Sequence, residues 1–293
     1  MKNDFTNVIS LWDEMVAYET LWAMPDQSLK TIHVYFAEFK KHPTEILHEI
    51  WSSNFNLEQI KKDVEKYLKE LKNGFSVCIN GTFHYPKKLR DARYPIELFY
   101  YKGDIGYLES TCISVVGTRN PSEEGMKRTR KLVKGLIEKG YTVLSGLAKG
   151  IDTVAMKTAI EEKGNTIGII GTPITEYYPK ENKEFQDYIA NNKLLISQVP
   201  FYRYSNEPFY TKKRYFPQRN ETMAALSKAT IIVEASESSG TLTQARACLQ
   251  QGRKLYILNS CFENPNISWP RTYAEKGAVR VRDFDDIFST LEE

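Results

Sequence analysis

The chain has 293 residues, of which 41% are hydrophobic and 26% are charged, and its formal net charge is +3. This composition is ordinary for a soluble globular protein of one large or two smaller domains, and so small a net charge is by itself no argument for nucleic-acid binding. No apolar stretch is long enough to cross a membrane, and the amino terminus lacks a signal-peptide pattern, so we expect a cytoplasmic protein without a membrane partner.

Residues 1–80 predict a small helical domain. Apolar residues recur there at helical spacing, and no glycine occurs before Gly74. The first 60 residues hold nine acids against four bases, which disfavours direct contact with a phosphate backbone. The domain either packs on the rest of the protein or docks a partner, and the sequence leaves both interpretations open.

Residues 81–106 have the composition of a connector. Two prolines follow tyrosines, at Tyr85-Pro86 and Tyr94-Pro95, and a short strand-like run begins at Leu98. We therefore predict a connector over these residues and a main domain over residues 107–293.

The main domain alternates apolar, strand-like runs with helical runs. This alternation predicts an α/β fold with a parallel sheet, whose loops gather at the carboxyl ends of the strands. The predicted strands are Ile113–Val116, Thr142–Leu144, Thr166–Ile170, Leu194–Ile196, Thr230–Val233, Lys254–Leu258 and Val279–Val281.

Three glycine-bearing loops of this sheet suit an anion. Glycine lets backbone amides approach a phosphate, and the helix that follows directs its positive end to the same place. Arg119 could also hold a phosphate through its guanidinium, or form only a surface salt bridge, and Asp152 could cap a helix. The candidate phosphate-binding residues are Gly117, Thr118 and Arg119 in the first loop, Ser145, Gly146 and Lys149 in the second, and Ser239, Gly240 and Thr241 in the third.

The segment 201–220 combines aromatic and basic residues, and its only acid is Glu207. Cations that track phosphates, beside rings on which bases stack, are typical of proteins that bind single-stranded nucleic acid. Alternatively the rings fix a long loop to the core, and both roles are compatible. The aromatics are Phe201, Tyr202, Tyr204, Phe209, Tyr210, Tyr215 and Phe216, and the bases are Arg203, Lys212, Lys213, Arg214 and Arg219.

A second basic group follows Ser122. Lys127, Arg130, Lys131 and Lys134 recur at i, i+3, i+4 and i+7 and therefore share one face of a predicted helix. Such a face is either simply solvated or an extension of a nucleic-acid track.

The main domain offers little catalytic chemistry. All four histidines precede it, and it contains no nucleophile–histidine pair, HExxH motif or P-loop lysine. The four cysteines show no CxxC spacing, so we expect buried thiols rather than ligands or disulfides. The sequence favours a binding protein without cofactor, metal or catalytic residues over an enzyme.

Taken together, these residues resemble the DNA-processing protein A (DprA/Smf) family over about residues 85–290. The matching segments are Tyr85-Pro86 through Lys102-Gly103-Asp104, Val115 to Arg119, Leu144 to Asp152, Tyr178-Pro179, Phe216 to Asn220, Val233-Glu234-Ala235, Ser239 to Leu242 and Gly252-Arg253.

The resemblance implies an extended Rossmann-like sheet with helices on both faces and a domain that binds single-stranded DNA. It also implies a homodimer, a role in natural transformation, and loading of the RecA recombinase as a partner. Arg119 matches the arginine of the family's Gly-Ser-Arg loop. Phe216, Arg219 and Asn220 match its Phe-Pro-x-Arg-Asn motif, and Lys212, Lys213 and Arg214 match its DNA-contacting lysine region.

The same fold group contains nucleotide sensors and cytokinin-activating (LOG-like) phosphoribohydrolases. The hydrolases use a Gly-Gly-x-Gly-Thr-x-x-Glu motif whose glutamate does chemistry. In this chain Gln244 stands at that position, and a neutral amide cannot act as a carboxylate base. We therefore expect single-stranded DNA binding, with a nucleotide sensor or such a hydrolase as the alternative.

Overall fold

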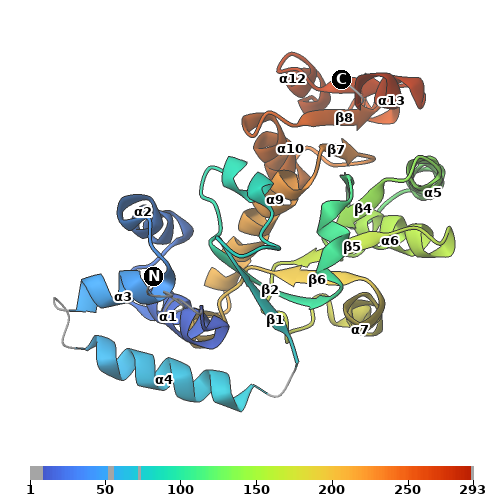
Figure 1. Cartoon of the computed structure of the whole chain (residues 1–293). Coiled ribbons are helices and arrows are strands. Elements are labelled where there is room, and N and C mark those ends of the chain that lie inside the picture. Colours follow the sequence, from blue (N-terminus) through green and yellow to red (C-terminus); the bar gives the residue numbers. More distant parts are fainter. Residues whose placement is uncertain (1–8, 52–55, 72–73, 292–293) are drawn as a thin grey trace, which may run out of the picture.

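The computed structural model describes residues 9–51, 56–71 and 74–291 (Figure 1). The first helices are α1 (Leu11–Ala23), α2 (Leu29–Phe39), α3 (Pro43–Trp51) and α4 (Leu57–Glu70). The later ones are α5 (Glu123–Glu138), α6 (Ile151–Glu161), α7 (Lys183–Asn192), α8 (Phe201–Asn206), α9 (Tyr215–Leu226), α10 (Thr241–Gln250), α11 (Asn259–Glu263), α12 (Trp269–Ala274) and α13 (Asp285–Leu291). Short 3-10 helices are η1 (Lys87–Asp91), η2 (Ile105–Glu109), η3 (Lys180–Asn182) and η4 (Thr211–Arg214).

The strands are β1 (Ser76–Ile79), β2 (Leu98–Gly103), β3 (Cys112–Val116), β4 (Thr142–Ser145), β5 (Thr166–Ile170), β6 (Leu194–Ser197), β7 (Ala229–Ile232), β8 (Lys254–Leu258) and β9 (Val279–Val281). They form one nine-stranded sheet in the order β1-β2-β6-β5-β4-β3-β7-β8-β9. The chain runs outward from β3 to β6 and then returns to the other side of β3 as β7. The strand order therefore reverses between β3 and β7, where Val115 lies opposite Ile231. Ligands of open α/β sheets bind outside the carboxyl ends of the strands at such a reversal.

All seven strands predicted for the main domain are present, and their bounds differ from the prediction by no more than one residue. These seven strands pair in parallel, as predicted, and the sheet has an additional antiparallel edge, where β2 pairs with both β1 and β6. β1 has only four residues, and its burial rises from exposed Ser76 to buried Ile79 without alternating. The sequence therefore carried no clear strand signal there. The domain boundaries at residues 80 and 106 stay a prediction. β1 and β2, which flank residues 80–97, both belong to the main sheet.

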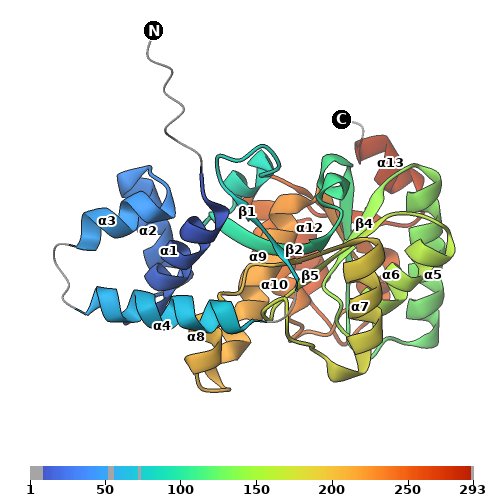
Figure 2. The same ribbon diagram turned by 60° about the horizontal axis from the view of Figure 1, so that its bottom comes forward.

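Helices cover both faces of the sheet, as the family resemblance implies (Figures 1 and 2). Successive strand residues point to opposite faces, so neighbours in β3 enter different cores. Val115 belongs to the core that contains Leu136 of α5 and Ala155 of α6. Val116 belongs to the core that contains Met223 of α9 and Cys248 of α10. The Rossmann-like α/β architecture is thereby confirmed.

Helices α1 to α4 lie together at one end of the molecule (Figure 2). α1 is their centre, and its Tyr18, Leu21 and Trp22 are buried. It contacts α3 and α4 among the helices of this end, and β1 and α8 of the rest of the protein. The amino-terminal helices therefore pack on the sheet domain, as one of the two sequence interpretations expects.

All four cysteines are buried free thiols, as predicted. Burial raises the pKa of Cys78, Cys248 and Cys261 to about 11, so these thiols are poor nucleophiles at neutral pH. No helix in the described part of the chain is long and apolar enough to span a bilayer.

Candidate nucleic-acid interface

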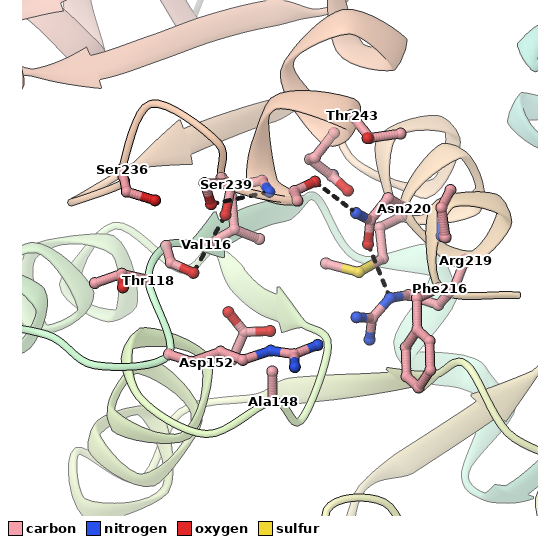
Figure 3. Close-up of a pocket in the computed structure, with 17 residues that line it drawn as sticks. Val116, Thr118, Ala148, Asp152, Phe216, Arg219, Asn220, Ser236, Ser239 and Thr243 are labelled. Carbon is pink, nitrogen blue, oxygen red and sulfur yellow. Dashed lines mark hydrogen bonds between the residues drawn. The ribbon is translucent and has the colours of Figure 1, made fainter. Parts of the chain in front are cut away.

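The loops after β3, β4 and β7 converge at the strand reversal (Figure 3). They enclose a cavity of about 310 Å³, which we call the switch-point cavity. A second cavity of about 150 Å³, the side cavity, shares Arg119, Phe216 and Arg219 with the first and extends to Tyr178. The two cavities are adjacent, and we refer to them together as the hollow at the carboxyl edge of the sheet.

Most of the residues predicted to bind phosphate line this hollow. Gly117, Thr118, Arg119, Phe216, Arg219, Asn220, Ser239, Gly240 and Thr241 line the switch-point cavity, Gly146 and Lys149 line the side cavity, and Ser145, Lys212, Lys213 and Arg214 line neither. The buried hydroxyl of Ser145 donates to Val115 O at 2.7 Å, so it joins β4 to β3 and does not face a ligand.

Arg119 is the exposed cation of the first loop. Its loop is held in place because Ile151 N donates to Thr118 O at 3.1 Å. Gly150 permits this approach, since a Cβ there would lie 2.3 Å from Thr118 O and its φ is +87°. The Arg119 guanidinium forms no ion pair with any described residue and lines both cavities, so it is free to meet a phosphate.

Arg219 is buried and holds the loops together. Its Nη1 donates to Gly146 O at 2.6 Å and to Ile169 O at 2.5 Å, and its Nε donates to Asn220 Oδ1 at 3.0 Å. Burial lowers the pKa of Arg219 to about 10, and the nearby Asp152 carboxylate opposes this shift. Arg219 therefore forms part of the cavity wall, with most of its hydrogen-bonding capacity used internally.

The third loop is tied to the other two. Asn220 Nδ2 donates to Gly240 O at 3.2 Å, and Thr241 Oγ1 donates to Gly117 O at 3.2 Å (Figure 3). Arg219 and Asn220 thus link the loops after β4 and β7 through one turn of α9. This network fixes the shape of the hollow before any ligand arrives.

Asp152 does not cap helix α6, although that was an expected role. Its carboxylate is buried and accepts from Gly146 N at 3.0 Å, while Gly150 occupies the N-cap. Burial raises the pKa of Asp152 despite the positive charge of Arg219. The carboxylate therefore shapes the second loop.

The amino-terminal end of α5 is not open to a ligand phosphate, which corrects the expectation for the first loop. Glu234, which follows β7, accepts from Ser122 N at 3.2 Å and from Ser122 Oγ at 2.7 Å. Ser122 in turn caps the helix by accepting from Gly125 N at 2.9 Å. A carboxylate of the protein itself therefore fills the place favoured by the helix dipole.

Two aromatic rings form one wall of the side cavity. Phe216 and Tyr178 have their ring centroids 5.0 Å apart at an angle of 52°. Tyr178 is 43% exposed and Phe216 is half-buried, so the pair offers apolar surface beside Arg119. Tyr178 belongs to a segment that matches the DprA/Smf family, but no role was predicted for its side chain.

The basic segment before α9 is divided between anchoring and exposed residues. Phe201 and Tyr215 are buried, whereas Phe209 is 79% and Tyr210 is 74% exposed. Glu207 forms ion pairs with Arg203 and Arg214, which lowers their availability to a ligand. Lys212 Nζ lies 4.3 Å from the centroid of the Tyr204 ring, and Lys213 is exposed. The buried rings therefore fix the segment to the core, and contact of its exposed residues with nucleic acid stays a prediction.

Glu19 of α1 fixes the start of this segment. Its fully buried carboxylate accepts from the Tyr100 hydroxyl, from Phe201 N at 2.8 Å and from Tyr202 N at 3.0 Å. Burial raises the pKa of Glu19 to about 7. Arg203 adds a second connection, since its Nη1 donates to Trp22 O at 2.9 Å. The amino-terminal helices thus position the basic segment.

Catalytic groups are sparse around the hollow. The buried Gln244 amide is hydrogen-bonded to Thr230 Oγ1 at 3.3 Å, and the Glu234 carboxylate is bonded to Ser122. Within the described ranges, no group of three or more His, Cys, Asp or Glu could hold a metal ion. The arrangement can hold an anion through Arg119, Lys149 and backbone amides, and an aromatic base against the Phe216–Tyr178 pair.

The chain is thus an α/β protein with a Rossmann-like sheet and a cationic, aromatic hollow at the reversal of its strand order. The model of the DNA recombination-mediator protein A family matches residues 76–292. The chain belongs to this family, the DprA/Smf proteins.

Curated relatives cover most of the chain. The DNA processing protein DprA of Bacillus subtilis is 30% identical over 257 residues, which are 85% of this chain and 84% of the relative. The DNA processing protein DprA of Streptococcus pneumoniae is 34% identical over 208 residues, 71% of each chain.

Two solved structures share the fold. The X-ray structure of DprA from Streptococcus pneumoniae has a TM-score of 0.70 and 26% identity, and the match covers 96% of this chain and 94% of that one. DNA processing protein A of Helicobacter pylori, whose structure concerns its single-stranded DNA binding mode, has a TM-score of 0.63 and 27% identity. That match covers 75% of this chain and 97% of the neighbour.

Proposed function

We propose that this protein binds single-stranded DNA in the hollow formed by the switch-point cavity and the side cavity, and that it acts in DNA processing during DNA uptake. The observation that carries the proposal is the placement of exposed, unpaired Arg119 and the Phe216–Tyr178 ring pair on the same cavity. A cation beside exposed aromatic surface suits one phosphate and the base attached to it. Single strands are favoured over duplex because the rings need an unpaired base.

The network around Arg219 supports the proposal. Arg219 and Asn220 fix the loops after β4 and β7, and Ile151 N holds the loop of Arg119 through Thr118 O, so the site loses little conformational freedom when DNA binds. Lys149, in the loop after β4, and Lys213, in the basic segment before α9, are exposed. Both would add contacts to the phosphates of a bound strand.

Arg119→Ala is expected to weaken single-stranded DNA binding without destabilising the fold. The side chain is exposed and unpaired within the described residues, so its loss should change the free energy of unfolding by less than about 0.5 kcal/mol. One lost phosphate contact should reduce the slope of log K against log salt concentration by about 0.7. Titrations at several salt concentrations measure both effects. Arg130→Ala, an exposed arginine of α5 that lines neither cavity, is the control, and equal behaviour of the two variants would contradict the assignment.

Phe216→Leu is expected to reduce single-stranded DNA affinity by about 1 kcal/mol or more, because leucine keeps apolar volume but offers no ring for stacking. Fluorescence anisotropy with a labelled oligonucleotide measures the change. Tyr188→Leu, which removes a 42% exposed ring from α7, is the matched control. An affinity loss no greater than that of the control would show that no base stacks on Phe216.

Partners are proposed from family membership. The proposed partners are a RecA-type recombinase and a second copy of this chain. We also propose a cytoplasmic location. These proposals rest on what the family resemblance implies and not on a contact in the structure.

A nucleotide sensor or a nucleotide hydrolase of the same fold group is the alternative. A free nucleotide would use the same cation and rings, so a sensor needs no other site. Hydrolysis is less well supported, because Gln244 is a buried amide and Glu234 is bonded to Ser122. We therefore favour binding without a reaction on nucleotides.

A further inference from the structure

A third cavity lies farther along the same carboxyl edge of the sheet. It has a volume of about 270 Å³ and is bounded by α5, by the ends of β8 and β9, and by the start of α13. We call it the β9 pocket. Of the cations that the sequence indicated for a nucleic-acid track, Lys131 lines it.

Three cations line the β9 pocket. Arg128 and Lys131 are three residues apart on α5 and therefore share a face, and Arg282 follows β9. In the described part of the chain, the ion pairs of α5 involve Lys127 and Lys134 instead. The basic face that the sequence indicated on this helix is therefore partly paired, while the cations of the pocket remain available.

Two buried polar atoms of the pocket residues have no partner. Arg128 Nε and Ser260 Oγ are buried, and neither is hydrogen-bonded to any described residue. Buried donors are almost always satisfied in native proteins, by protein groups, water or a ligand. Both residues line the β9 pocket, so its wall contains two polar atoms that the described residues of the protein do not satisfy.

The two acids of the pocket are already engaged. Asp283 accepts from the backbone N of Asp285 at 3.0 Å, and Glu263 accepts from Asn259 Nδ2 at 2.6 Å. With three cations against two acids, the lining carries an excess positive charge. An anion is therefore the favoured occupant.

The rest of the lining is apolar and includes an aromatic ring. Phe284 lines the pocket beside Leu132 and Val281, and Lys131 Nζ lies 5.9 Å from its ring centroid. A cation beside a ring and an apolar wall again suits a nucleotide, with phosphate on one side and sugar or base on the other.

We propose that the β9 pocket is a second subsite for the same DNA strand, with a phosphate held by Arg128, Lys131 and Arg282. This inference rests on the proposed function. The pocket adjoins the first hollow because Ser236 of the switch-point cavity follows β7, Ser260 of the β9 pocket follows β8, and these strands are neighbours. The Glu234 carboxylate accepts from Ser122 at the capped end of α5.

The test compares Arg128→Met with Arg130→Met, which removes an equal charge from an exposed position of the same helix. Anisotropy titrations use thymidine oligonucleotides of increasing length at several salt concentrations. Arg128→Met should leave the shortest bound oligonucleotides unaffected, weaken the longer ones, and reduce their salt slope by about 0.7. Arg282→Met should give the same pattern, and because this side chain is exposed, a folding defect cannot account for the loss.

Three outcomes would overturn the inference. Arg128→Met and Arg282→Met could match Arg130→Met at every length, or they could weaken short and long oligonucleotides equally. A deoxynucleoside monophosphate could also lose affinity in Arg128→Met while long strands do not, which would assign the pocket to a free nucleotide. If the wild-type protein binds no oligonucleotide at all, the proposed function itself fails, so the two failures are distinguishable.

Discussion

Replacing Arg219 with methionine is expected to lower the free energy of unfolding by about 3 kcal/mol, although the position belongs to a motif associated with DNA. The substitution leaves Gly146 O and Ile169 O without their buried donor, and it removes the positive charge that compensates the buried Asp152 carboxylate. Urea unfolding followed by circular dichroism measures the change. DNA affinity should also fall, because the loops after β4 and β7 lose the residue that joins them.

A comparison with Arg119 distinguishes a residue that supports the fold from one that contacts DNA. Arg119→Met removes the same cation from an exposed position and should leave unfolding within about 0.5 kcal/mol of the wild type while weakening DNA binding. If Arg219→Met proves as stable as Arg119→Met, the Arg219 guanidinium does not hold the loops after β4 and β7 together.

Protonation of Glu19 is expected to raise the free energy of unfolding. Burial raises the pKa of Glu19 from 4.5 to about 7, so the folded protein binds a proton that the unfolded chain has released between these values. The stabilisation is fully present below pH 4.5 and is lost as the pH rises through about 7. The difference of roughly 2.5 units corresponds to about 3 kcal/mol, at about 1.4 kcal/mol for each unit.

Glu19→Gln isolates this contribution because glutamine does not titrate. The free energy of unfolding of the wild type, relative to that of the variant, should fall by about 3 kcal/mol between pH 4.5 and 7.5. The change with pH is the relevant quantity, since the new amide also meets the donors Phe201 N and Tyr202 N and adds a constant cost. Parallel pH curves for the two proteins would contradict the assignment to Glu19.

The loops of the site could be predicted from the sequence because they follow buried parallel strands. Such strands are continuous apolar runs that end at turn residues, so Arg119, Gly146 and Gly240 could be assigned to one edge of the sheet. The direction of each side chain could not be assigned in this way. Arg119 and Arg219 were both predicted to bind phosphate, yet one is exposed and the other donates to carbonyls of β5 and the loop after β4.

Contacts between segments far apart in the chain could not be predicted from the sequence either. Glu19 meets the start of α8, which lies 182 positions later in the chain, and nothing in its helical surroundings marks it as a partner. Arg214 was predicted to contact phosphate, but it pairs with Glu207 and lies outside both cavities of the hollow. The β9 pocket combines α5 with residues more than 120 positions away, so only the folded chain brings its cations together.

A comparison of single-stranded DNA, duplex DNA of the same length and free deoxynucleoside monophosphates, at one salt concentration, tests the central claim most directly. Stacking on the Phe216–Tyr178 pair contributes about 1–3 kcal/mol for each base, so single-stranded DNA should bind about tenfold or more tightly than duplex. Free nucleotides should bind more weakly still, because they make only one of the phosphate contacts of a strand. Equal affinity for single strand and duplex, or free nucleotides that bind as tightly as the oligonucleotide, would contradict the account.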